Sequence, residues 1–236
     1  IRIVAATDVI GMGESPRAAL RGRDDSSVAR AVALVADGTA QAVVSAGNSG
    51  AFMALSAMRL GTVPGVKRPA IAVTLPSPAG KRVLLDAGAN ADCKPEHLRD
   101  FGLMGAVYAQ YALNIDNPRV GVLNIGAERG KGNELTKATY ELLEATDLNF
   151  VGNVEPDALF HKGCDIVVCD GFVGNVLLKA GESLTLRLLG WIRDNVRDSL
   201  RYRLGFALCA DLFRHMKKCA DFSEYGGALL HMAEQV

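Results

Sequence analysis

The sequence predicts an α/β protein with a doubly wound, mainly parallel sheet and a long helical hairpin near its C-terminal end. Apolar runs of strand length alternate with helical patterns along residues 1–180, as parallel strands joined by crossover helices require. Four of these runs end in small residues together with Asn, Asp or Lys, and three of the four lead directly into a helical pattern. In a parallel sheet such breaks lie at the carboxyl edge, where ligands bind.

Seven segments are predicted as strands from their short apolar runs. They are Ile1–Ala6, Ala42–Ser45, Ala70–Leu75, Val83–Asp86, Val120–Asn124, Phe150–Gly152 and Ile166–Asp170. Helices are predicted between them, at Ser26–Ala36, Ser49–Leu60, Pro95 to Leu113 and Asn133–Ala145. Pro95 stands where a proline is favoured in the first turn of a helix.

After Asp170 the pattern becomes helical, over Asn175–Leu200 and then Leu204–Cys219. Leu184, Leu188 and Ile192 form a stripe that we expect to be buried against the sheet or a second subunit. We therefore divide the chain into an α/β core (1–180), a hairpin for dimer or partner contacts (181–220) and a return to the core (221–236). The hairpin is locally basic, through Arg187, Arg193, Arg197, Arg201, Arg203, Arg214, Lys217 and Lys218. A solvated helix surface and a docking site for an acidic partner explain this equally well.

Composition excludes several classes of protein. The 236 residues carry a formal net charge of zero and no nucleic-acid-reading motif, which argues against a general nucleic-acid binder. No apolar run is as long as a membrane span requires, and the first residues do not form a secretory signal. The five cysteines have no C-x-x-C spacing, so we expect reduced thiols in a cytoplasmic protein and no metal site.

The usual nucleotide and nucleophile motifs are absent. Gly11-Met-Gly13 lacks the third glycine of the dinucleotide fingerprint, and the segment 126–132 has Gly132 where a phosphate loop needs Ser or Thr. We therefore expect neither NAD nor ATP. There is no G-x-S-x-G elbow, and no histidine stands beside a serine or cysteine that it could activate. The four histidines are interpreted as packing or surface residues.

An anion site at the carboxyl edge remains. The first turn offers Ser45, Asn48, Ser49 and Gly50, a second offers Lys131 and Asn133, the last offers Asn175 and Lys179, and Asp86 and Asp170 end strands at the same edge. Asn and Ser are also preferred helix caps, so any one turn alone is better explained by capping. Convergence of several turns at one edge favours binding. Either aspartate could orient a lysine, act as an acid–base group or only cap a loop.

Five segments in order, SAGNSGA, LLDAGAN, NIGAERGKGNELTK, CDGFVGNVLLK and FSEYGGALL, resemble the bacterial phosphate acyltransferases of phospholipid synthesis. The resemblance runs from about residue 1 to about residue 230, and Ala127 departs from it where a glutamate is expected. The family's opening Asp- and Gly-rich segment and closing glycine/histidine strand are missing, so we expect the core to lack its N-terminal segment and the C-terminal return to be incomplete. The resemblance implies a relative of the isopropylmalate dehydrogenase and phosphate acetyltransferase folds.

The resemblance also implies an activity: transfer of a long-chain fatty acyl group from acyl carrier protein to inorganic phosphate, without a cofactor. It implies a cytoplasmic homodimer that is loosely associated with the membrane or contacts a membrane acyltransferase. Catalytic roles are expected for Lys131, Asn175 and Asp170, and substrate binding for Ser45, Asn48, Ser49, Gly50, Asp86, Asn90, Asn133 and Lys179. The alternatives are a short-chain phosphate acyltransferase that uses coenzyme A and a non-catalytic anion-binding scaffold.

Overall fold

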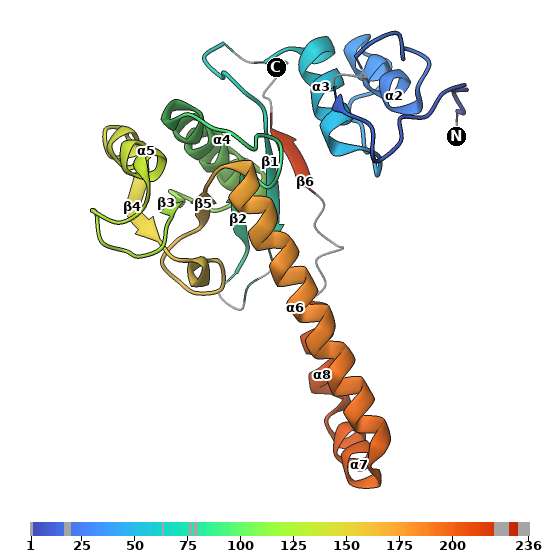
Figure 1. The fold of residues 1–236 in the computed structure, drawn as a ribbon, viewed down its shortest axis with the longest axis vertical. Coiled ribbons are helices and arrows are strands. Elements are labelled where there is room, and N and C mark those ends of the chain that lie inside the picture. Colours follow the sequence, from blue (N-terminus) through green and yellow to red (C-terminus); the bar gives the residue numbers. More distant parts are fainter. Residues whose placement is uncertain are drawn as a thin grey trace. The chain divides into compact units, whose positions relative to one another are not determined.

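The computed structural model describes residues 2–16, 20–62, 64–75, 77, 80–219 and 227–230. The chain divides into two compact units. One contains the residues up to 70 and those from 229 onward, and the other contains residues 71–228. Each unit is described below by itself (Figure 1).

The first unit is built on two helices, α2 (Ser27–Ala36) and α3 (Ser49–Leu60), which match the predicted helices. Ser26 caps α2 and Asn48 caps α3, each through a side-chain oxygen. The two helices bury a small core between them, made of Ile10, Val28, Ala29, Val32, Ala51 and Leu55.

Two of the predicted strands, Ile1–Ala6 and Ala42–Ser45, are wrong. Residues 2–6 and 42–45 form no strand, and among the described residues between 2 and 62 the one β-type pairing is an isolated bridge between Asp8 and Ser26. Ile3 and Val44 are 89% and 97% exposed. An apolar, β-branched run becomes a strand only where a neighbour accepts its backbone hydrogen bonds, and composition does not supply that neighbour.

The second unit is centred on a sheet whose order is β4-β3-β5-β2-β1-β6. Its strands are β1 (Ala70–Leu75), β2 (Arg82–Leu85), β3 (Arg119–Leu123), β4 (Asn149–Val154), β5 (Ile166–Val168) and β6 (Gly227–Leu230). β4, β3, β5 and β2 are parallel neighbours, whereas β1 is antiparallel to β2. The predicted α/β fold with a mainly parallel sheet is confirmed. Most of the predicted return over 221–236 lies outside the described residues, and β6 is the part that is described.

Helices cover both faces of the parallel strands. α4 (Pro95–Leu113) and α5 (Glu134–Glu144) pack against each other on one face, where a Cβ at Gly105 would meet Ile166 and Leu85. On the other face, Leu84, Leu123 and Val167 belong to a cluster that also includes Leu159 of the short helix η1 (Pro156–Leu159). Leu177 and Leu178 of α6 (Gly171–Asp198) pack against this cluster, so the start of α6 is fixed to the sheet.

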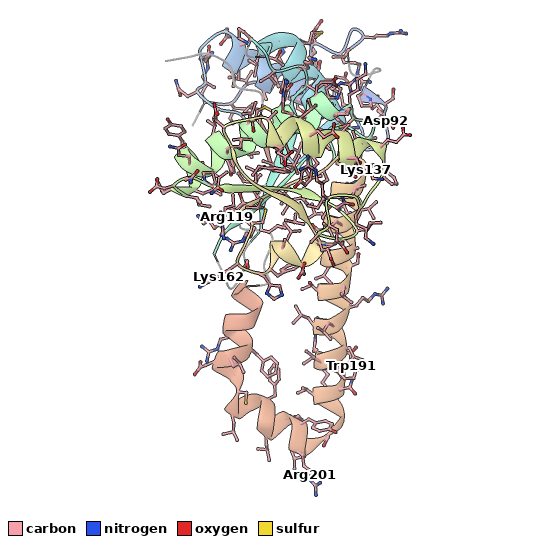
Figure 2. The ribbon with its side chains drawn as sticks, turned by 90° about the vertical axis from the view of Figure 1, so that its left-hand side faces the viewer. Asp92, Arg119, Lys137, Lys162, Trp191 and Arg201 are labelled. Atoms are coloured by element: carbon pink, nitrogen blue, oxygen red, sulfur yellow. The ribbon has the colours of Figure 1, made fainter. Side chains whose placement is uncertain are left out.

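Beyond its first turns, α6 leaves the sheet as one side of a long arm. α7 (Leu200–Leu208) and α8 (Ala210–Cys219) form the turn and the returning side, with Arg201 at the tip (Figure 2). The predicted second helix is thus broken near Cys209. Apolar side chains along the arm are open to solvent in the single chain: Leu184, Leu188 and Trp191 are 71%, 54% and 64% exposed. Their burial against a second subunit stays a prediction.

The opposite, amino edge of the sheet is held by a buried ion cluster. Asp165 precedes β5 and accepts two hydrogen bonds from the Arg119 guanidinium, at 2.9 and 3.0 Å, and one from the Arg119 backbone N–H. Arg82 lies 3.5 Å from the same carboxylate and also donates to the His161 carbonyl. Burial raises the pKa of Asp165, but the hydrogen bonds from Arg119 outweigh it and hold this pKa below its usual value.

We predict that Asp165→Asn lowers the free energy of unfolding by about 3 kcal/mol at neutral pH, because it leaves Arg82 buried without a carboxylate. The ion cluster stabilises the fold above about pH 4, and this contribution is lost as the pH falls through the lowered pKa of Asp165. The difference between wild type and variant should therefore shrink in acid. Urea titrations at several pH values measure it, with Asp147→Asn on the exposed surface as the control.

If wild type and Asp165→Asn differed in free energy of unfolding by the same amount at neutral and acidic pH, this account of Asp165 would be contradicted.

Candidate active site at the carboxyl edge of the sheet

The buried carboxylate of Asp86 organises the loop that follows β2. Its Oδ1 accepts hydrogen bonds from the backbone N–H groups of Ile71, Gly88 and Ala89, at 3.0, 3.1 and 3.0 Å. Its Oδ2 accepts from the backbone and the side-chain amide of Asn90, at 2.7 and 2.9 Å. Both oxygens are therefore used inside the protein. These contacts assign Asp86 a positioning role and do not show it facing a substrate.

The N-terminus of α6 packs directly on this loop. Gly171 donates its N–H to the Asn90 carbonyl at 2.8 Å, and a Cβ at Gly171 would lie 2.8 Å from Asp86 Oδ2. A Cβ at Gly174 would lie 1.9 Å from the Asp86 carbonyl oxygen, so only glycine fits there. Asn175 lies against Gly88, whose φ of +135° suits glycine. The structure thus brings Asp86, Asn90 and Asn175 together, as the sequence predicts.

Asp170 ends the neighbouring strand and caps α6. Its Oδ1 accepts the Val173 backbone N–H at 2.9 Å, which uses one of its two oxygens. The residue is half-buried and lines a cleft between α6 and α5. Capping is one of the three roles that the sequence left open for Asp170, and the residue lines the edge of the cleft.

The loop from β3 to α5 carries Lys131 and is held by two asparagines. Asn124 accepts the Ile125 N–H at 2.8 Å and donates to the Lys131 carbonyl at 3.1 Å, which spans the loop from end to end. Asn153, at the end of β4, donates to the Glu128 carbonyl at 2.8 Å. The Lys131 side chain is exposed and passes Gly126, where a Cβ would lie 3.1 Å from its Cγ. No ion pair of Lys131 is found within the described part of the chain.

Asn133 caps α5 at the end of the same loop. Its Oδ1 accepts the Thr136 N–H at 2.9 Å, and its backbone carbonyl accepts the Thr136 hydroxyl at 3.1 Å. The cap leaves the N–H groups of Glu134 and Leu135 at the helix end, where an anion is stabilised by free donors and by the helix dipole. Asn133 and Thr136 both line the cleft.

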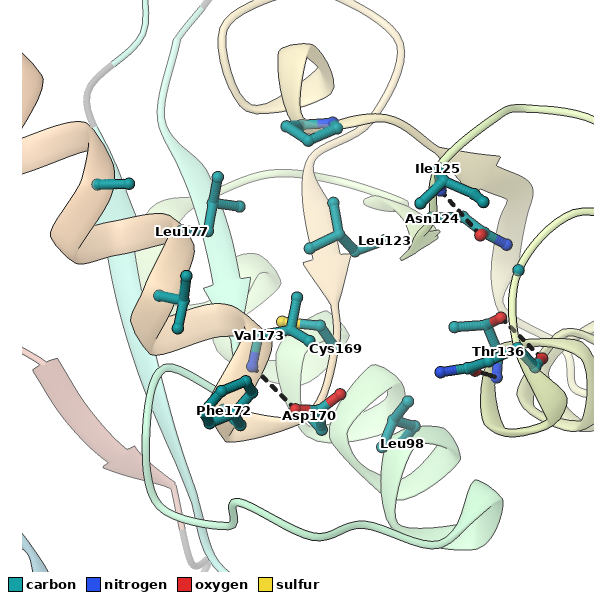
Figure 3. A pocket seen from close by; sticks show the side chains of 15 residues that line it. Leu98, Leu123, Asn124, Ile125, Thr136, Cys169, Asp170, Phe172, Val173 and Leu177 are labelled. Atoms are coloured by element: carbon teal, nitrogen blue, oxygen red, sulfur yellow. Dashed lines mark hydrogen bonds between the residues drawn. The ribbon is translucent and has the colours of Figure 1, made fainter.

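The cleft has a volume of about 710 Å³ and lies over the carboxyl ends of β3 and β5 (Figure 3). One wall is α6, with Phe172, Val173 and Leu177, and Asn124 and Thr136 lie on the wall across from it. Leu98, at the start of α4, and Pro156, in η1, complete the lining. Of the site residues predicted from the sequence, Asn133 and Asp170 line this cleft, whose α6 wall is apolar.

Cysteine chemistry does not occur in this cleft. Cys169 lines it but is 4% exposed, and burial raises the pKa of its thiol well above the usual value. Burial likewise raises the pKa of Cys164, to about 11. Both thiols are protonated at neutral pH and are therefore poor nucleophiles. These two cysteines are therefore poorly suited to act as nucleophiles in this cleft.

The first-unit turn has the geometry of a helix cap. Asn48 is 7% exposed, its Oδ1 accepts the Ala51 N–H at 3.0 Å, and its amide donates to the carbonyls of Gly11, Met12 and Glu14. The side chain of Asn48 is thus occupied within its own unit, whereas Ser49 is exposed and Ser45 accepts the Gly47 N–H. Because the units are described separately, convergence of this turn with Lys131 stays a prediction.

Comparison with known proteins defines the family. Residues 1–236 match the family described as "Fatty acid synthesis protein". The chain is 48% identical to a phosphate acyltransferase from Thermodesulfovibrio yellowstonii, over 98% of this chain and 66% of that protein. It is 49% identical to one from Desulforamulus reducens, over 98% of this chain and 69% of that protein. The chain belongs to the phosphate acyltransferase family. It spans about two thirds of the length of these relatives.

Solved structures with the same fold are more distant. A branched-chain phosphotransacylase from Enterococcus faecalis V583 superposes with a TM-score of 0.51 at 19% identity, over 68% of this chain and 64% of that chain. A phosphotransacetylase from Streptococcus pyogenes superposes with a TM-score of 0.50 at 18% identity, over 66% of this chain and 54% of that chain. These likenesses support the fold predicted for the phosphate acyltransferase family.

Two searches of the described residues give negative results. None of the described helices is long and apolar enough to cross a membrane. In the same part of the chain, no group of three or more His, Cys, Asp or Glu side chains is placed to hold a metal ion.

Several residues of the site escaped the sequence analysis. Asn124, like Asp86, is a polar residue at the end of a predicted strand. The sequence analysis gave it no role in the site. The α6 row of Phe172, Val176 and Ala180 follows helical spacing, but spacing does not tell an open face from a buried one. Lys179, which was predicted to bind substrate, is outside the cleft lining and lies 3.5 Å from Glu182.

We predict that Asn48→Ala lowers the free energy of unfolding of the first unit by at least about 1 kcal/mol, because the variant loses a helix cap. The Michaelis constant for phosphate in an acyltransferase assay should stay within twofold, since the contacts of this amide are internal. Thermal melting and phosphate titrations measure the two quantities. The matched control is Gln41→Ala, which removes an exposed amide side chain from the same unit and leaves the cap intact.

If Asn48→Ala instead raised the Michaelis constant for phosphate at an unchanged melting temperature, the amide would be a substrate ligand.

Proposed function

We propose that the chain is the larger part of an enzyme that transfers a long-chain fatty acyl group from acyl carrier protein to inorganic phosphate. The product is an acyl-phosphate for phospholipid synthesis. The observation that carries the proposal is the cleft over the carboxyl ends of β3 and β5, apolar along α6 and polar at the start of α5, in a chain of the phosphate acyltransferase family.

The proposed reaction needs no nucleophile from the protein. A phosphate oxygen attacks the thioester carbonyl, the new C–O bond forms, and the C–S bond breaks to release the carrier as its thiolate. Phosphate binds at the start of α5, beside Lys131 and Asn133. Lys131 stabilises the charge that develops on the carbonyl oxygen, and Asn175 and Asp170 orient the reacting groups at the start of α6. Positioning and charge stabilisation of this kind supply most of the rate in comparable reactions.

Features of the site support this mechanism. Lys131 is exposed at a loop that two asparagines hold in place, and the α5 N-terminus beside it has free N–H donors. The protonated state of Cys169 argues against an acyl-cysteine intermediate. Cations are scarce elsewhere at this edge: the described residues that line the cleft include no Lys or Arg.

The direct experiment is mass-spectrometric detection of acyl-phosphate after incubation of the chain with palmitoyl-acyl carrier protein and phosphate. Acetyl- and butyryl-coenzyme A, tested in parallel, distinguish the short-chain alternative. A non-catalytic scaffold would bind phosphate but cause no phosphate-dependent loss of thioester. If no donor gave acyl-phosphate, the proposed function would be wrong for this chain.

We predict that Lys131→Ala keeps the fold and lowers turnover about a hundredfold, the usual effect of losing one charge-stabilising donor. Steady-state rates with palmitoyl-acyl carrier protein measure the loss, and the melting temperature checks the fold. Lys137→Ala is the matched control, because Lys137 is an exposed lysine on the adjacent helix. Near-normal activity of folded Lys131→Ala would remove Lys131 from the site.

The arm is the proposed contact surface for acyl carrier protein and for a second copy of the chain. We propose that its arginines attract the acidic carrier protein, since complementary charge mainly speeds association. We also propose that the exposed stripe of Leu184, Leu188 and Trp191 is covered by a second copy in a homodimer. Contact with the membrane surface or a membrane acyltransferase, and a cytoplasmic location, remain part of this proposal.

We predict that the double variant Arg197→Glu/Arg201→Glu reduces kcat/KM for acyl carrier protein about tenfold at low salt and less at high salt. Turnover of a small thioester mimic should not change, because the arm does not line the cleft beyond Ala180. Rates at two ionic strengths measure the effect. Equal losses with carrier protein and mimic would show that these arginines maintain structure and do not dock a partner.

A further inference from the structure

One wall of the cleft exposes more apolar surface than folding requires. Phe172, Val173 and Val176 are 64%, 41% and 53% exposed, although they stand beside a polar edge where reactants are proposed to bind. Leu177 and Ala180 continue this wall along α6. Exposed apolar side chains that are gathered along one face of a cavity indicate a binding site for apolar groups.

The cleft has the dimensions and direction of a chain-binding groove. Its volume of about 710 Å³ is within the usual range for small-molecule sites. The row of Phe172, Val176 and Ala180 covers about 12 Å of helix, starting at Asp170 and the strand ends. The uncharged polar side chains of the lining are Asn124, Asn133 and Thr136, and Asn124 and Thr136 lie across from α6 in Figure 3. Asp170, at the start of α6, is the charged polar group of the lining.

The chemistry of the lining selects the ligand class. Among the described lining residues Asp170 is the charged one, and none is a cation that could pair with the phosphates of a nucleotide or of coenzyme A. On the α6 side the Asp170 carboxylate would repel such groups, whereas the proposed site for inorganic phosphate is across the cleft, at the start of α5. A neutral hydrocarbon chain gains about 0.8 kcal/mol for each methylene that leaves water, so the apolar wall favours it.

We infer that this cleft binds the acyl chain of the substrate, with the carbonyl group at the start of α5 and α6 and the tail running along α6 past Val176 to Ala180. This inference rests on the proposed function. Ala180 lies at the distal end of the row, and its small side chain leaves room for the tail. The residue at position 180 therefore sets the longest chain that the cleft accommodates.

The test uses Ala180→Phe, which fills the distal end, and Ser183→Phe as the control, an equal change at an exposed position of α6 outside the cleft. Binding is measured without turnover, by the fluorescence of cis-parinaric acid and its displacement by palmitate or octanoate. Ala180→Phe should weaken palmitate displacement at least about tenfold, as expected for a few methylenes returned to water, and leave octanoate within twofold. Ser183→Phe should match wild type for both.

Turnover gives a second, independent measurement. Ala180→Phe should reduce kcat/KM for palmitoyl-acyl carrier protein at least about tenfold and leave that for hexanoyl-acyl carrier protein within twofold. Equal losses for both lengths, or none for either, would overturn the inference. If Val176→Asp changed the molecular mass in light scattering and left palmitate displacement intact, the wall would be an interface between copies and the inference would be wrong.

The two proposals fail in different ways. Palmitate binding that depends on Ala180, without any acyl-phosphate formation, would contradict the proposed function and leave the acyl-chain site in place. Acyl-phosphate formation with a chain-length profile that Ala180→Phe does not alter would keep the proposed function and remove the acyl-chain site.

Discussion

The candidate site depends on the hydrogen bonds that saturate the buried carboxylate of Asp86. Five N–H donors from Ile71, Gly88, Ala89 and Asn90 converge on its two oxygens. Hydrogen bonds to a charged group are worth about 1.5–3 kcal/mol each, so this one side chain fixes the end of β2, its neighbour β1 and the following loop. The loop in turn positions α6, because the backbone carbonyl of Asn90 accepts a hydrogen bond from the N–H of Gly171, the first residue of that helix.

The loop that carries Lys131 is restrained in a different way. Asn124 closes it from the end of β3, Asn153 holds its middle from β4, and Arg129 pairs with Glu144 while lying over the Tyr140 ring. The asparagine contacts are between uncharged groups, and the Arg129–Glu144 ion pair is exposed. The side chain of Lys131 takes part in none of these contacts. The backbone is therefore fixed while the cation stays available, which is what stabilising a developing charge requires.

The sequence predicted most of the second unit because local and global signals agree there. Strands β1 to β5, and helices α4 and α5 with their caps, follow from apolar runs, Pro95 and Asn133, with end positions shifted by at most two residues. The failures have one physical origin: each needed a partner in space. The run Ala42–Ser45 had strand composition but no neighbour to pair with. The sequence also does not show that five N–H groups, four of them from the backbone, donate to Asp86, and a contact of Asp86 with substrate stays a prediction. The cleft wall of α6 could not be predicted, since a helical stripe shows which residues share a face and not what covers that face.

α6 combines three environments that make opposite demands on its sequence. At Gly171 and Gly174 the backbone approaches Asp86 so closely that no side chain fits. Leu177 and Leu178 are packed against the sheet, whereas Phe172 and Val176 face the cleft and remain half-exposed. Farther along, Leu184 and Trp191 are exposed in the part of the chain that the structure describes. The fold of the core explains the two glycines and the packed Leu177 and Leu178. The cleft wall and the arm are apolar surfaces that the core does not need, so selection for ligand or subunit contacts is the remaining physical reason for their composition.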